Sequence, residues 1–199
     1  MYHIKKDKRS VQSGILIFRA LKDLMDEKPF DAITVTELVR RADLGRATFY
    51  RNFDNIEDVL FLQCDRRFEQ LVQLLLDAKK TALNGGGVAP HRLFLQFWYD
   101  DSDIIELMIK ARRFDFLVRA FERVYRDLYN GGGLKASAPD CEYTPRYMEY
   151  VLSIQVGMSL GLLLKWLENG KDIPPDELAD FMEQLLENTL RSTDKLIPD

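Results

Sequence analysis

The sequence predicts an all-α protein, on the evidence of two apolar stripes with helical spacing and the near absence of strand patterns. A first stripe recurs at steps of three and four residues, as on one face of an α-helix, and comprises Val11, Ile15, Phe18, Leu21 and Met25. A second stripe from Ile56 to Ala78 predicts a helix of about seven turns. Only segment 32–36 alternates like a strand, which is too little to build a sheet.

The composition is that of a soluble globular chain, with 46% apolar and 30% charged residues in a length of 199. The longest stretch without a charge, 150–164, is shorter than the roughly 17 to 25 residues of a spanning helix, so we expect no membrane partner. The two cysteines, Cys64 and Cys141, have neither metal-ligand nor disulfide spacing, so we expect no metal, no cofactor and a cytoplasmic location. No nucleophile and base form a recognisable pattern, which argues against an enzyme.

The segment between the two long helices carries signals for two short helices. Thr34 and Glu37 have the spacing of a capping box, which satisfies the exposed backbone amides at a helix start. Asp43 falls at a bend where a left-handed backbone is tolerated, and Gly45 can cap a second helix over about 46–53. Two short helices joined by a tight turn form a helix-turn-helix.

The outward side of the second short helix combines small residues, hydroxyls and arginines. Small residues permit close approach to base edges, Arg can donate two hydrogen bonds to guanine, and Tyr or Thr hydroxyls can contact phosphates. Residues 1–53 hold 11 basic and 7 acidic groups, against 17 and 25 in the remainder, so the basic part of the chain is where a polyanion would bind. Residue types alone also allow a solvated helix pair that acts only as a structural corner.

Segment 33–53, followed by Glu57-Asp58-Val59-Leu60, resembles the TetR family of transcriptional regulators. The resemblance covers about fifty residues from Ser10 to Leu60, and the rest of the chain matches only in length, helical pattern and a closing helix pair. It implies a three-helix DNA-binding head with a helix-turn-helix in residues 1–54. Residues 55–199 would then form a helical effector-binding and dimerisation domain. The implied function is that of a ligand-responsive repressor, a homodimer on a palindromic operator in double-stranded DNA.

The resemblance also implies which residues contact DNA. Arg46, Ala47 and Arg51 would lie near bases, while the others would hold the DNA backbone or neighbouring edges. The full predicted set is Thr34, Thr36, Arg46, Ala47, Thr48, Tyr50, Arg51 and Asn52.

Four positions depart from the usual family pattern. Asp43 replaces a turn glycine, Gly45 a serine cap, and Asn52 a histidine. Ile56 stands where a lysine typically opens the next helix, and an apolar side chain cannot replace a cation, so one phosphate contact is in doubt. This leaves a second hypothesis open, a regulator-like co-activator that works through protein contacts with weakened DNA binding.

Aromatic residues are dense between His91 and Tyr129, which hold nine of the 22 in the chain. A pocket for a small apolar or aromatic effector would have this composition, and so would an ordinary core. The candidate pocket residues are Phe94, Phe97, Trp98, Met108, Phe121 and Tyr125.

The last two predicted helices carry apolar faces that suggest a partner. One face contains two small residues four apart, and the last helix has a stripe too wide for a helix covered on one side. The candidate interface residues are Tyr150, Ile154, Gly157, Gly161, Leu164, Phe181 and Leu185. By resemblance these helices form a four-helix homodimer interface, and the alternative is a closed monomer core. A symmetric dimer would bind half-sites about 34 Å apart, or a multiple of that distance.

Overall fold

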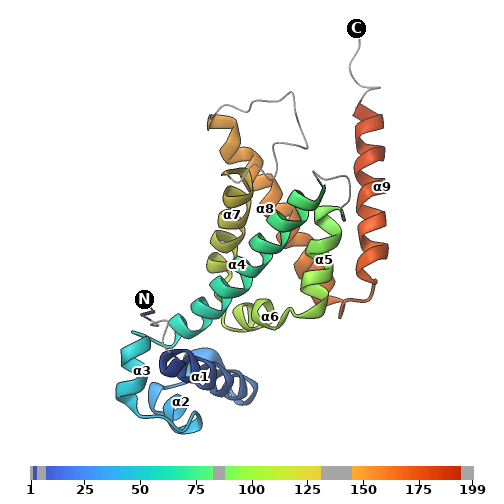
Figure 1. The fold of residues 1–199 in the computed structure, drawn as a ribbon. Coiled ribbons are helices and arrows are strands. Elements are labelled where there is room, and N and C mark those ends of the chain that lie inside the picture. Colours follow the sequence, from blue (N-terminus) through green and yellow to red (C-terminus); the bar gives the residue numbers. More distant parts are fainter. Residues whose placement is uncertain (1, 4–7, 83–87, 131–144, 194–199) are drawn as a thin grey trace. The chain divides into compact units, whose positions relative to one another are not determined.

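The computed structural model of the chain describes residues 2–3, 8–82, 88–130 and 145–193 (Figure 1). These described residues form α-helices and one short 3-10 helix and contain no strand, which confirms the predicted all-α class. The 3-10 helix η1 (Phe30–Ala32) precedes α2. The α-helices are α1 (Lys8–Glu27), α2 (Val35–Arg41), α3 (Arg46–Asn52), α4 (Glu57–Ala82), α5 (Pro90–Asp100), α6 (Asp103–Lys110), α7 (Phe114–Asn130), α8 (Pro145–Glu168) and α9 (Pro175–Thr193).

The contacts of the chain divide it into two compact units. The first unit comprises residues 1–70 and 102–124, and so contains α1 to α3, the start of α4, α6 and much of α7. The second comprises residues 71–101 and 125–199, with the rest of α4, α5, α8 and α9. The functional boundary expected after residue 54 lies inside the first unit. A division by contacts does not test where DNA or an effector binds, so that boundary stays a prediction.

The core of the first unit forms where α1, α2 and α3 pack against one another (Figure 1). The predicted helical period of α1 is confirmed, but its buried line is shifted to Ile17, Leu21 and Leu24. Ile15, which we placed in the apolar stripe, is 41% exposed. Periodicity alone located the stripe only to within about one residue, because the apolar residues of this helix span more than one face.

Helix α6 packs on α1, and an ion pair lies near each end of the contact. Lys22 pairs with Asp103 at the start of α6, and Asp26 pairs with Lys110 at its end, with 2.8 Å between Lys110 Nζ and Asp26 Oδ1. Between these pairs, α6 buries an apolar face that includes the fully buried Ile105. Both ion pairs are exposed and each contributes little, so the buried apolar face of α6 supplies most of the stabilisation of this contact.

In the second unit, α5 lies beside α9 (Figure 1). Arg92 of α5 makes ion pairs with Asp180 and Glu183 of α9, the second at 3.1 Å. Trp166 of α8 is buried, and its indole donates a hydrogen bond of 2.8 Å to the carbonyl of Ile173. These contacts order the helices that carry the predicted interface residues.

Candidate DNA-contacting surface

The start of α2 is a capping box, as the spacing of Thr34 and Glu37 predicted. The Glu37 amide donates to Thr34 Oγ1 at 3.3 Å, and the Thr34 amide donates to Glu37 Oε2 at 3.0 Å. Lys28 Nζ also donates to Glu37, at 2.6 Å. The hydrogen bond from Lys28 and then those from Thr34 lower the pKa of Glu37 to about 2. The helix start is thus held to the segment that follows α1.

The turn between α2 and α3 has the left-handed residue that the sequence predicted. Asp43 has φ 52°, and the Leu44 amide donates to the carbonyl of Val39 at 2.9 Å, as in a Schellman motif. Gly45 is the N-cap of α3 in an extended conformation, with φ −81° and ψ 150°. A Cβ there would meet no atom within 4 Å, so this backbone would accept the serine common in the family. The departures at both positions are therefore compatible with the turn.

Two phenylalanines fix the inward side of α3. Phe49 and Phe53 are fully buried, and their ring centroids are 5.6 Å apart. Their burial anchors α3 on α1 and α2 and leaves its opposite side facing solvent. This is the arrangement that a helix needs to enter a DNA groove from a rigid support.

The outward surface of α2 and α3 contains most of the predicted DNA-contacting residues. Thr34, Thr36, Arg46, Ala47, Tyr50 and Arg51 are exposed, and Thr48 is half-buried. The Tyr50 side chain is 55% exposed and its ring packs edge-on against Phe49, at 5.3 Å between centroids. The Arg46 guanidinium donates to the Thr36 hydroxyl, so α2 and α3 share one polar surface.

Asn52 requires a correction. We predicted a side-chain contact with DNA, but this residue is only 1% exposed. Its amide nitrogen donates to the carbonyl of Thr48 at 2.8 Å, one turn back in the same helix. The side chain points into the packed side of α3, so it offers no donor to a phosphate in this conformation.

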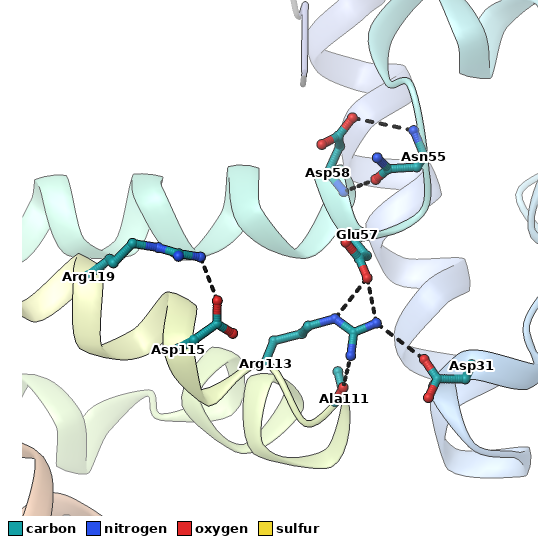
Figure 2. Close-up of polar contacts among 8 residues, drawn as sticks. All are labelled: Asp31, Asn55, Glu57, Asp58, Ala111, Arg113, Asp115 and Arg119. Atoms are coloured by element: carbon teal, nitrogen blue, oxygen red, sulfur yellow. Dashed lines mark hydrogen bonds and ion pairs between the residues drawn. The ribbon is translucent and has the colours of Figure 1, made fainter.

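Ile56 lies just before α4, at a helix start that other side chains stabilise. The Asp58 amide donates to Asn55 Oδ1 at 2.9 Å, and Asp58 Oδ2 accepts from the Asn55 amide (Figure 2). Asp58 Oδ2 also accepts from the Asp54 amide. These bonds cap α4 without a cation. Ile56 itself is half-buried, so the doubt about one phosphate contact stands.

Sequence patterns did not predict the contact between the N-terminus and the end of α3. The His3 amide donates to the Asn52 carbonyl at 2.8 Å. The Tyr2 hydroxyl donates to the buried Asp65 of α4 at 2.5 Å, and burial followed by Asp65 raises the pKa of Tyr2 to about 12. Tyr2 and His3 therefore link α3 to α4. No periodicity or motif in the sequence places these residues together.

The predicted effector residues belong to both units. Met108 and Phe121 are fully buried in the first unit, where Phe121 contacts Phe68 edge-on. In the second unit, Trp98 is fully buried and Phe94 and Phe97 are half-buried around it. The sixth residue, Tyr125, shares a hydrogen bond with Ser159 of α8. Burial of this kind fits the core interpretation as well as a pocket lining, so the effector site stays a prediction.

The predicted interface residues form an apolar surface in the second unit. The α8 apolar face consists of Tyr147, Tyr150, Ile154, Gly157, Met158 and Gly161, spaced by three and four residues, and its large side chains are 56 to 65% exposed. A Cβ at either glycine would meet no atom within 4 Å. Phe181 and Leu185 of α9 are also more than half exposed, whereas Leu164 is half-buried.

The same helix bears on the expected absence of a membrane partner. Within the described residues, Tyr147–Glu168 is long and apolar enough to cross a membrane by length and composition, with a mean hydropathy of 1.4 and 28% of the tested window buried. We excluded a membrane partner because the uncharged stretch 150–164 is short, and that criterion was therefore too strict. Core helices of soluble proteins pass the same test, so the finding is weak evidence for a span.

Three packed helices with a capped helix-turn-helix and an outward surface of arginines and hydroxyls define the class of helix-turn-helix DNA-binding proteins. The N-terminal region matches the family model for bacterial regulatory proteins of the tetR family over residues 17–62. A model for a transcriptional regulator C-terminal region matches residues 92–188. The chain belongs to the TetR family of transcriptional regulators.

Individual relatives agree with this assignment. The chain is 32% identical over 65 residues to the dhaKLM operon transcriptional activator DhaS of Lactococcus lactis, a match that spans 33% of this chain and only 35% of that protein. Among solved structures, Lin0861 from Listeria innocua has a TM-score of 0.68 at 15% identity, covering 94% of this chain and 96% of its own. The fatty acid degradation regulator FadR of Bacillus halodurans has a TM-score of 0.53 at 15% identity, with 92% and 96% covered. At these identities the structural likenesses show the fold alone.

Proposed function

We propose that this regulator is a homodimeric repressor that binds a palindromic operator through α3 and releases it when a small apolar or aromatic effector binds the second unit. The observation that carries the proposal is the outward surface of α2 and α3, where arginines, small residues and hydroxyls gather above a buried aromatic anchor. As a regulator that meets bacterial DNA, the protein would act in the cytoplasm.

Specific contacts would come from the residues that α3 presents. Arg46 and Arg51 supply donors for guanine, and Ala47 allows the helix to approach the base edges. Tyr50 and Thr36 supply hydroxyls for phosphate oxygens. Arg46 bonds Thr36 in the free protein, so it enters the groove by exchanging one hydroxyl acceptor for the two acceptors of a guanine edge, O6 and N7.

Dimerisation would bury the α8 apolar face together with Phe181 and Leu185. Soluble monomers rarely expose a contiguous apolar patch of this kind, and its two small residues allow a second α8 to approach closely. A second copy of the chain is the occupant that matches a two-fold symmetric operator. The alternative occupant, a lipid bilayer, predicts sedimentation with vesicles in place of a soluble dimer.

An effector site in the second unit would combine aromatic walls with a few polar groups. Tyr125 bonds Ser159 of α8, and Gln155 lies one turn before Ser159. The buried Gln155 Oε1 has no hydrogen-bond partner within the described part of the chain. A ligand with one donor could satisfy that oxygen while its apolar part packs against apolar side chains of the second unit, and this would stabilise one state of the protein over another.

The protein could regulate transcription in either direction, and repression and activation are the two candidate functions. A dimer bound across a promoter excludes RNA polymerase without further contacts, which supports repression. The relative from L. lactis is named as an activator, which supports activation as the second candidate. Transcription in vitro from a promoter that carries the selected operator distinguishes them by whether added protein lowers or raises the transcript.

DNA binding is tested with duplexes selected from a random pool by the wild-type protein, and with the fragment upstream of its own gene. We expect Arg46→Ala to weaken specific binding by at least about tenfold, since a base contact from Arg is worth roughly 1–3 kcal/mol. Arg119→Ala is the matched control, because this arginine is also exposed but lies on α7. Wild-type affinity should fall steeply with salt. Absence of binding at low salt would refute the proposal and favour the co-activator that works through protein contacts.

A further inference from the structure

Arg113 lies in the short connection between α6 and α7 and uses all three of its guanidinium nitrogens (Figure 2). Its Nε donates to Glu57 Oε1 at 2.8 Å, and its Nη2 donates to the same oxygen and to Asp31 Oδ1, the latter at 3.2 Å. Its Nη1 donates to the carbonyl of Ala111 at 3.0 Å. We call these four residues the Arg113 cluster.

The position of Arg113 is itself fixed by the end of α6. The Arg113 amide donates to the carbonyl of Met108 at 2.9 Å, and Arg112 adopts a left-handed backbone with φ 56°, so α6 ends in a Schellman motif. The guanidinium lies 5.3 Å from the centre of the Phe30 ring, and the side chain is only 23% exposed. A half-buried guanidinium held on a fixed backbone has little freedom to leave its partners.

The two carboxylates of the cluster flank the helix-turn-helix in sequence. Asp31 lies in η1, just before the N-cap of α2, and Glu57 is the first residue of α4, just after α3. One side chain therefore ties the entry and the exit of segment 32–56 to the end of α6. All of these elements belong to the first unit.

We propose that Arg113 is a positioning residue for DNA binding, because it holds both ends of the helix-turn-helix segment and so orders the outward surface of α3. It does not touch DNA itself. The expected effect on DNA affinity rests on the proposed DNA-binding function, whereas the ordering of α3 is inferred from the contacts of the Arg113 cluster. Ordering α3 before it meets DNA removes part of the conformational entropy cost of binding.

The cluster requires arginine in particular. A guanidinium presents donors in a rigid planar fork that can serve two carboxylates and a carbonyl together, whereas lysine offers one compact ammonium on a flexible stem. Arg119 of α7 provides the contrast: among the described residues it pairs with Asp115, one turn away, and lies 5.9 Å from the centre of the Phe116 ring, both on α7, and it is 62% exposed (Figure 2). That pair joins no other element to α7.

The first experiment measures binding to the selected duplex for Arg113→Lys, Arg113→Gln, Arg119→Lys and Arg119→Gln at a temperature where circular dichroism shows every variant folded. We expect both Arg113 variants to bind about tenfold more weakly and both Arg119 variants to stay within twofold. The slope of log affinity against log salt should stay at the wild-type value, since no phosphate contact is lost. A slope reduced by about one would make Arg113 a DNA contact, and unchanged affinity would make it merely stabilising. Either result overturns the proposal.

The second experiment does not depend on DNA. Hydrogen exchange of the amides in segment 32–56 should be about tenfold faster in Arg113→Lys than in Arg119→Lys, while the second unit exchanges as in the wild type. If Arg113 variants fail to fold, Asp31→Asn removes the charge from one contact, at a carboxylate that is 73% exposed, and should give a smaller increase in the same segment. If the exchange rates of segment 32–56 do not change, the positioning role of Arg113 is refuted, even if the wild-type protein binds DNA. A wild type that binds no DNA refutes the proposed function alone.

Discussion

Truncation of Ile154 to alanine tests the dimer through the centre of the α8 apolar face. The substitution removes three carbon atoms, worth about 2.4 kcal/mol if fully buried at ~0.8 kcal/mol per carbon. Because Ile154 is 60% exposed in the isolated chain, about 1.4 kcal/mol of this is available to an interface. A two-fold symmetric interface loses that amount from both protomers, so the dimer should weaken by about 3 kcal/mol, which is roughly a hundredfold in Kd.

Sedimentation equilibrium over a wide range of protein concentration measures this change directly. The matched control is Ile15→Ala, which truncates an isoleucine that is 41% exposed on α1, outside the α8 apolar face. The control should dimerise as the wild type does, and both variants should keep the wild-type thermal midpoint of the monomer to within a few degrees. An unchanged dimer constant for Ile154→Ala, or an equal shift in the control, would refute the assignment of this face to a second copy. Wild-type protein that sediments only with lipid vesicles would assign the face to a membrane.

Two further substitutions test which contacts stabilise the helix-turn-helix. Phe49→Ala should lower the free energy of unfolding by about 3–5 kcal/mol, since it leaves a cavity beneath α3, and urea unfolding that shows under 1 kcal/mol would mean that Phe49 does not anchor the helix. Glu37→Gln should reduce stability near neutral pH. The hydrogen bonds from Lys28 and Thr34 depress the pKa of Glu37 to about 2 in the folded state, so its contribution is present above pH 4.5 and is lost as the pH falls towards 2. Thermal midpoints of variant and wild type should therefore converge between these values, and a difference that persists at pH 2 would contradict the assignment.

Local chemistry made the helix-turn-helix predictable. The capping box at Thr34, the left-handed turn at Asp43 and the start of α3 after Gly45 each depend on residues within five positions of one another. The same holds for the burial of Phe49 and Phe53, because helical spacing alone separates the inward side of α3 from its outward side. Spacing also placed Tyr150 and Ile154 of α8 on one face, but it did not single out the exposed Tyr147 and Met158.

Contacts between residues distant in the chain could not be predicted. The amide side chain of Asn52 suits phosphate by its chemistry, but packing buries it, and a short helix of irregular polarity gives no sign of which polar residue will be covered. Arg113 appears in the sequence as one arginine among many. Its significance comes from Glu57 and Asp31, which are 56 and 82 positions away.

Hydrogen bonds along a helix and the alternation of its faces involve neighbours in the chain, so composition and spacing were sufficient to predict an all-helical protein with a helix-turn-helix near its N-terminus. The prediction of a DNA-binding regulator needed the resemblance to the TetR family as well. The pairing of α6 with α1, the burial of Asn52 and the convergence of three elements on Arg113 depend on which surfaces meet when the helices pack. Which surfaces meet depends on the shapes and charges of side chains throughout the unit, so no single stretch of the sequence determines it.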